Sequence, residues 1–251
     1  MYSIHIKRPY HKPDFYIQTT FLELYDILHA IYGPFFSDDP PDEDAYRMDF
    51  CRNEPDYTEL AVLESALYDI ANIDKAYIAL HAGVVVKNSS AHMFMGPTEA
   101  GKSTLTAYLC SNGFEYYSDD IAIIDRKELN VYPYPRPVLL RNGGVSVLKN
   151  NGIDFSNSEF YKYGDVERTH LFLPFNNSVH SKIVALYFIE RGSENLPPEI
   201  INKDKAFSIL LKSLLVYVRV NTELLGLLNR LCQFPVYLLK YKDMEFVKNI
   251  L

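Results

Sequence analysis

The residues with the clearest chemistry lie at positions 96–103, which read Gly-Pro-Thr-Glu-Ala-Gly-Lys-Ser and match the phosphate-loop pattern GxxxxGK[ST] in full. Glycines let successive backbone N–H groups point into a concave nest, and a helix that starts near Lys102 adds the positive end of its dipole. Lys102 is expected to reach the β- and γ-phosphates of ATP or a close relative, and the Ser103 hydroxyl to ligate Mg²⁺. The predicted nucleotide-binding residues are Gly96, Pro97, Thr98, Glu99, Ala100, Gly101, Lys102, Ser103 and Thr104.

An acid pair, Asp119 and Asp120, follows Ser118, which is fifteen residues after Ser103, and stands directly before the apolar run 121–124. A hydroxyl-phosphorylating enzyme needs one carboxylate to take the proton of the attacking oxygen and another to hold Mg²⁺. We predict Asp119 as the base and Asp120 as the metal partner. The competing interpretation gives the metal to Asp125, at the end of the apolar run, where many NTPases place it, with Asp119 in a solvated turn.

One histidine and two arginines are further candidates for catalysis. His81 lies in an apolar strand predicted over residues 77–86, where it could donate a hydrogen bond toward the phosphates or simply pack in the core. Arg136 lies between two prolines and Arg141 precedes an Asn-Gly-Gly sequence. Both could neutralise transferred charge, because a guanidinium matches phosphate oxygens. Arg168 is an additional candidate of the same kind.

The elements that must position these residues follow from hydrophobic periodicity. Residues 1–75 are predicted to form a small α+β domain, with strands at 3–7 and 15–20, a helix at 21–32, an acidic exposed loop at 37–44 and a helix at 58–73 that ends near a boundary at Asp74. Residues 76–251 are predicted to form an α/β domain, with strands at 77–86, 91–95, 121–124, 183–189 and 235–239 and helices at 104–111, 205–218, 222–232 and 243–250. The region between residues 137 and 183 is rich in Asn, Ser and Gly and is expected to be mobile.

Composition excludes several classes of function. Lys and Arg number 25 against 32 Asp and Glu, a formal charge of -7, which argues against nucleic acid as a partner. The three cysteines are odd in number and lack CxxC spacing, as expected for reduced thiols in the cytoplasm. No apolar stretch approaches the length of a membrane span, so no membrane partner is expected.

Taken together, His81, the loop at 96–103 and Ser118-Asp-Asp ahead of a buried strand resemble the HPr kinase/phosphorylase family, over roughly residues 77–125. The resemblance implies the P-loop fold that this family shares with ATP-dependent phosphoenolpyruvate carboxykinases. It also implies transfer of phosphate to a serine hydroxyl, with Asp119 as general base, or as acid in the reverse direction. His81 then becomes an active-site candidate.

The resemblance also bears on the acceptor. The family's long glycine-rich signature is matched only faintly by residues 140–145, which argues against HPr itself. Relatives of this size are similar to kinases encoded with peptide natural-product systems, including those that phosphorylate the C-terminal serine of lasso precursor peptides. We therefore expect an ATP- and Mg²⁺-dependent kinase acting on a serine of a peptide or protein, in a family that often forms homo-oligomers. The alternatives are a nucleotide-dependent regulatory protein without transfer to a hydroxyl, and a small-molecule kinase.

Overall fold

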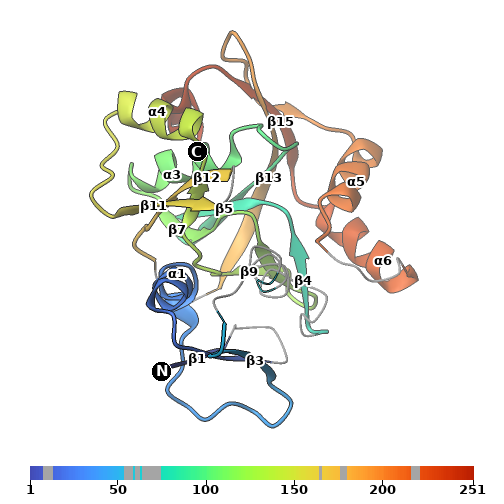
Figure 1. Ribbon diagram of the computed structural model, residues 1–251. Coiled ribbons are helices and arrows are strands. Elements are labelled where there is room, and N and C mark those ends of the chain that lie inside the picture. Colours follow the sequence, from blue (N-terminus) through green and yellow to red (C-terminus); the bar gives the residue numbers. More distant parts are fainter. Residues whose placement is uncertain are drawn as a thin grey trace. The chain divides into compact units, whose positions relative to one another are not determined.

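The computed structural model describes residues 1–7, 14–53, 59, 63, 75–163, 166–175, 180–215 and 221–251 (Figure 1). These residues form two compact units, one of Met1–Tyr77 with Lys162–Val166 and one of Ile78–Tyr161 with Glu167–Leu251. The helix predicted at residues 58–73, apart from Glu59 and Leu63, lies outside the described residues, and so does the predicted boundary at Asp74.

In its described segments the first unit contains a three-stranded sheet and an 11-residue helix. The sheet has the order β1-β2-β3, with β1 antiparallel to β2 and β2 parallel to β3. The elements are β1 (Tyr2–Ile6), β2 (Phe15–Thr19), α1 (Leu22–Tyr32), the 3-10 helix η1 (Gly33–Phe35) and β3 (Tyr46–Phe50). The predicted first two strands and helix are confirmed, and residues 37–44 contain no helix or strand, as predicted. Strand β3 was not predicted.

The second unit is mixed α/β and is built on a nine-stranded sheet. Its order is β4-β8-β9-β13-β6-β5-β7, with β15 paired to β13 and to β14. The strands are β4 (Tyr77–Leu80), β5 (Gly83–Lys87), β6 (Ser90–Met95), β7 (Glu115–Ser118), β8 (Ala122–Asp125), β9 (Asn130–Tyr132), β13 (Ser181–Arg191), β14 (Glu199–Ile200) and β15 (Val236–Tyr241). The long strand β13 runs parallel to both β6 and β15. The carboxyl ends of these three strands therefore meet at one edge.

Helices cover both faces of this sheet (Figure 1). One face packs against α5 (Lys203–Lys212) and α6 (Thr222–Leu231), and the other against α3 (Lys102–Cys110), α4 (Asn142–Asn150) and α7 (Met244–Ile250). Asparagine side chains cap α5 and α6 by accepting hydrogen bonds from their first turns. No helix in the described part of the chain is long and apolar enough to cross a membrane.

The apolar run at residues 77–86 is predicted to form one strand, but in the structure it forms two. Strand β4 pairs with β8, and β5 pairs with β6 and β7, with the break at His81 and Ala82. The backbone N–H of His81 donates to the carbonyl of Ser213 at 2.6 Å, outside the sheet. A strand buried on both faces is apolar throughout, so its sequence shows no alternation that would mark such a break.

The region expected to be mobile instead forms regular structure in its described part. Strands β10 (Val138–Leu140), β12 (Val166–Leu171) and β11 (Ser158–Tyr163) form a small sheet in that order, and α4 follows β10. Helix α4 begins with Asn and two glycines. These residues have low helix propensity, so the sequence pattern did not predict a helix here. It is stabilised by packing, because Leu148 is fully buried and Val145 and Val147 lie against the core.

Two buried histidines predict a loss of stability in acid. His170 and His92 are 1% and 8% exposed, and burial lowers the pKa of each to about 4, helped by the charges of Arg136 and Lys87 respectively. The unfolded pKa is near 6.5, so their contribution is fully present above that pH and is lost as the pH falls through the folded value. We expect the free energy of unfolding to fall by on the order of 2 kcal/mol for each histidine between pH 7 and pH 4. Urea unfolding at both pH values tests this: the His170→Gln variant should show a smaller pH effect, and an unchanged effect would contradict the assignment.

Candidate active site

The phosphate-loop residues connect the end of β6 to the start of α3, at the edge where three parallel strands end. A Cβ on Gly96 would lie 3.1 Å from the carbonyl oxygen of Ile189 on β13, closer than an ordinary van der Waals contact, so a side chain here would push the loop away from the sheet edge. Glu99 and Gly101 have positive φ angles of 69° and 91°. These left-handed residues curl the backbone into the concave shape that the motif predicts.

Lys102 folds back over this loop. Its Nζ atom donates to the carbonyl oxygens of Gly96 and Pro97 at 3.1 and 3.2 Å, and the residue is 6% exposed. Burial lowers its pKa, while the charges of Asp120 and Asp119 oppose the shift. Gly101 at the start of α3 brings no capping side chain, so the first turn of the helix is left for another acceptor.

The acid pair occupies a tight turn between β7 and β8. Asp120 has a φ of 67°, and the N–H of Ile121 donates to the carbonyl of Asp119 at 2.9 Å. Aspartate tolerates this left-handed conformation better than most residues. As a result the two carboxylates differ in environment: Asp119 is 3% exposed, whereas Asp120 is half-buried.

The Asp119 carboxylate is buried beside Ser103, and neither of its oxygens has a hydrogen-bond partner among the described residues. Burial raises its pKa well above the ordinary value, and the negative charge of Asp120 adds to this effect. Ser103, the backbone of Leu139 and the charge of Lys102 act in the opposite direction, although the first two lie outside good hydrogen-bonding geometry. An unpartnered buried carboxylate is costly, and such groups concentrate at functional sites.

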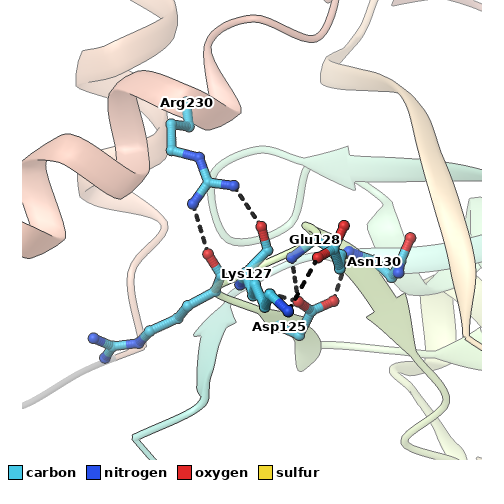
Figure 2. A network of polar contacts seen from close by, with 6 residues as sticks. Asp125, Lys127, Glu128, Asn130 and Arg230 are labelled. Atoms are coloured by element: carbon cyan, nitrogen blue, oxygen red, sulfur yellow. Dashed lines mark hydrogen bonds and ion pairs between the residues drawn. The ribbon is translucent and has the colours of Figure 1, made fainter.

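Asp125, the competing metal residue, is already engaged in a turn (Figure 2). One carboxylate oxygen accepts the N–H groups of Lys127 and Glu128 at 3.0 and 2.6 Å, and the other accepts that of Asn130 at 2.9 Å. Arg230 on α6 donates to backbone carbonyls of the same turn, at 2.7 and 2.6 Å. These contacts give Asp125 a structural role and favour Asp120 as the metal partner.

A pocket of about 540 Å³ lies over the phosphate loop, within the size range of small-molecule sites. It brings together most of the predicted residues: His81, Thr98, Glu99, Gly101, Lys102, Ser103, Thr104, Asp120 and Arg141, with Arg168. Gly96, Pro97 and Ala100 belong to the loop but do not line the pocket, and Asp119, Arg136 and Asp125 also lie outside its lining.

His81 and Arg136 differ in how they relate to this pocket. His81 lines it, and burial together with the Lys102 charge lowers its pKa, while Asp120 opposes the shift. Its imidazole is therefore suited to act as a neutral hydrogen-bonding group. Arg136 is buried and does not line the pocket, and its carbonyl accepts a 2.5 Å hydrogen bond from the hydroxyl of Tyr116 on β7.

Arg191 lines the pocket and was not predicted. It is the last residue of β13, its guanidinium lies 5.8 Å from the centre of the Tyr241 ring, and Nη2 donates to the Lys242 carbonyl at 3.3 Å. Its Cδ atom lies 3.5 Å from where a Cβ on Gly101 would be. In the sequence, Arg191 is only an arginine at the end of a buried apolar run. Its place beside the phosphate loop follows from the parallel pairing of β13 with β6, which the sequence does not show.

The donor set fits a magnesium nucleotide better than a metal held by protein alone. No group of three His, Cys, Asp or Glu side chains that could hold a metal ion occurs within the residues that the structure describes. Mg²⁺ in phosphate-transfer sites usually has one or two protein ligands, with the remaining positions taken by phosphate oxygens and water. The Ser103 hydroxyl and the Asp120 carboxylate fit that pattern.

Comparison with known proteins adds no family assignment. No protein-family model matches the chain, and no curated protein matches it significantly.

Two aspartate variants separate the metal assignments. Asp120→Ala is expected to raise the Mg²⁺ concentration needed for tight ATP binding about tenfold or more, since it removes a charged ligand. Asp125→Ala is expected to leave that requirement unchanged and to lower the free energy of unfolding by about 2 kcal/mol, because three backbone N–H groups lose their acceptor. ATP titrations at several Mg²⁺ concentrations, with thermal melting, measure both effects. The reverse pattern would assign the metal to Asp125.

Proposed function

We propose that this protein is an ATP- and Mg²⁺-dependent kinase that transfers the γ-phosphate to a serine hydroxyl of a peptide or protein. The observation that carries the proposal is the buried, unpartnered Asp119 carboxylate beside Ser103 of the phosphate loop. A protein that only binds nucleotide gains nothing from the cost of such a group. A phosphotransferase benefits from such a carboxylate, because the group can accept the proton of an incoming hydroxyl.

Different residues at the phosphate loop bind different parts of the nucleotide. When bound, MgATP supplies the transferable phosphoryl group and a metal that neutralises charge on its oxygens. Lys102 provides a point charge, released from the carbonyls of Gly96 and Pro97, and the first turn of α3 provides backbone N–H groups. Ser103 and Asp120 offer a hydroxyl and a carboxylate to the metal, and Arg191 offers a second cation at the same strand edge.

Asp119 acts on the acceptor. Its carboxylate does not line the pocket but interacts with Ser103, which does, so we expect the acceptor oxygen to lie at the Ser103 end of the pocket. Its raised pKa makes the carboxylate a better proton acceptor than an exposed aspartate. His81, also in the pocket, can orient the acceptor or a phosphate oxygen by a hydrogen bond.

Serine as the acceptor, and the fold of the HPr kinase and phosphoenolpyruvate carboxykinase type, rest on the resemblance of residues 77–125 to the HPr kinase/phosphorylase family. Intact-mass spectrometry tests the proposal: serine-containing peptides are incubated with the protein, ATP and Mg²⁺, alongside matched peptides with alanine in place of serine. We expect a gain of one phosphate on serine peptides alone. Tight nucleotide binding with no gain on any serine peptide would favour a regulatory protein instead.

A further inference from the structure

Two arginines line the pocket wall formed by β10, β12 and α4. Leu140, the last residue of β10, pairs with Thr169 on β12, so Arg141 directly follows the end of this pairing and Arg168 directly precedes Thr169. Both line the pocket, and a 3.3 Å hydrogen bond from Asn142 to Glu167 joins the two segments one residue further on. Two positive charges on one wall repel each other, and an anion bound between them would relieve that repulsion.

The two guanidinium groups have little to neutralise them. Arg141 pairs with Glu99 of the phosphate loop, but the two side chains are 52% and 68% exposed, so this ion pair contributes little. Arg168 makes one hydrogen bond among the described residues, from Nη1 to the carbonyl of Glu167 at 2.8 Å. A guanidinium has five N–H donors, which leaves the pair able to bind a further anion.

This arginine pair comes from other elements than Lys102 and Arg191, and Arg141 reaches the phosphate loop through its ion pair with Glu99. Lys102 bonds to loop carbonyls and Arg191 packs against Gly101, both at the edge where the parallel strands end. Arg141 and Arg168 come instead from the small sheet and the start of α4. The pocket thus carries two cations from the edge where the parallel strands end and two from the small sheet and the start of α4.

We propose that Arg141 and Arg168 bind a carboxylate of the acceptor, so that the preferred acceptor is an acidic peptide segment with glutamate or aspartate flanking the serine. This inference rests on the proposed function, because it assigns the acceptor end of the same pocket. Guanidinium groups match carboxylates through paired N–H bonds, and an incoming carboxylate replaces Glu99 on Arg141. Glu99 is then an internal competitor of the acceptor.

Binding of two capped, fluorescently labelled peptides tests this proposal. They differ only in having glutamate or glutamine on both sides of a single serine, and anisotropy is measured at low salt with ADP and Mg²⁺ present. The wild-type protein should bind the glutamate peptide about tenfold more tightly or better. Arg168→Gln should reduce this preference to about twofold or less, whereas Glu99→Gln should tighten glutamate-peptide binding about threefold. Arg52→Gln, at an exposed arginine of the first unit, is the matched control and should change neither affinity.

A second measurement tests whether the two arginines bind the acceptor peptide or the nucleotide. The affinity for ADP with Mg²⁺ should stay within about twofold in Arg168→Gln, and thermal melting checks that the variant is folded. Weaker ADP binding with an unchanged peptide preference would assign the arginines to the phosphates and overturn the proposal, and so would equal or undetectable binding of both peptides by the wild type. A protein that prefers the glutamate peptide but transfers no phosphate would retain this inference and refute the proposed kinase activity.

Discussion

Asp119→Asn is expected to lower phosphoryl transfer about 10³-fold while the affinity for MgATP stays within about threefold. The amide has the shape of the carboxylate but cannot accept the proton of the serine hydroxyl. Nucleotide contacts come from the loop, Lys102 and Asp120, which the substitution leaves in place. Single-turnover transfer and MgATP titration on the same preparation measure both quantities.

The same variant should be more stable than the wild type. Burial raises the pKa of Asp119 in the folded protein, so the folded state binds this proton more tightly than the unfolded chain. The ionised carboxylate therefore lowers stability as the pH rises from the unfolded pKa through the folded one, and this cost is present at high pH. Asparagine carries no charge, so a gain on the order of 1 kcal/mol is expected in alkaline buffer.

A carboxylate with a purely structural role would not give a variant that loses activity and gains stability. The control is Asp42→Asn, an exposed aspartate in the first unit, which should alter neither quantity. Retained transfer by Asp119→Asn would remove Asp119 from the role of base. A variant that loses stability together with activity would mean that the carboxylate holds the fold.

Lys102→Ala is expected to weaken MgATP binding roughly 10- to 100-fold and to lower transfer about 10³-fold. The ammonium group is the buried cation of the phosphate loop, 6% exposed, and no uncharged side chain can replace it at the phosphates. In the described part of the chain its Nζ atom hydrogen-bonds to the Gly96 and Pro97 carbonyls, both within the loop itself, so the fold should tolerate its removal.

Isothermal titration with MgATP and the peptide transfer assay measure the Lys102→Ala effects. Lys127→Ala is the matched control, because that side chain is 91% exposed in the β8–β9 turn. A variant that binds MgATP as well as the wild type would show that residues 96–103 are not a phosphate site, however well they match the pattern.

Local signals explain what the sequence could predict. The phosphate loop and α3 depend on residues adjacent in the chain, and α6, α7, β13 and β15 follow from hydrophobic periodicity, so the predicted elements lie within a few residues of the observed ones. The break at His81 and helix α4 depend on packing between distant segments. In α4 burial of Leu148 outweighs the poor helix propensity of its first residues.

The candidate site also combines features that the local sequence predicts with features that depend on distant packing. The sequence could place Asp119 and Asp120 near the phosphate loop, but only the left-handed turn at Asp120 shows that one carboxylate is buried and the other lines the pocket. Arg191 gains its position from the pairing of β13 with β6, and Arg141 and Arg168 come to one pocket wall through the pairing of β10 with β12. Pairing between distant strands leaves no mark in the local sequence.

We expect one pocket both to bind MgATP and to transfer its phosphate to a serine. The most direct measurement mixes the glutamate-flanked serine peptide with the wild-type protein, the Asp119→Asn variant and MgATP, and follows bound nucleotide and peptide mass in the same samples. We predict equal nucleotide binding by both proteins, and a phosphate on the peptide with the wild type alone. Nucleotide bound by both proteins with no phosphate on the peptide from either, or with equal phosphate from both, would contradict this account.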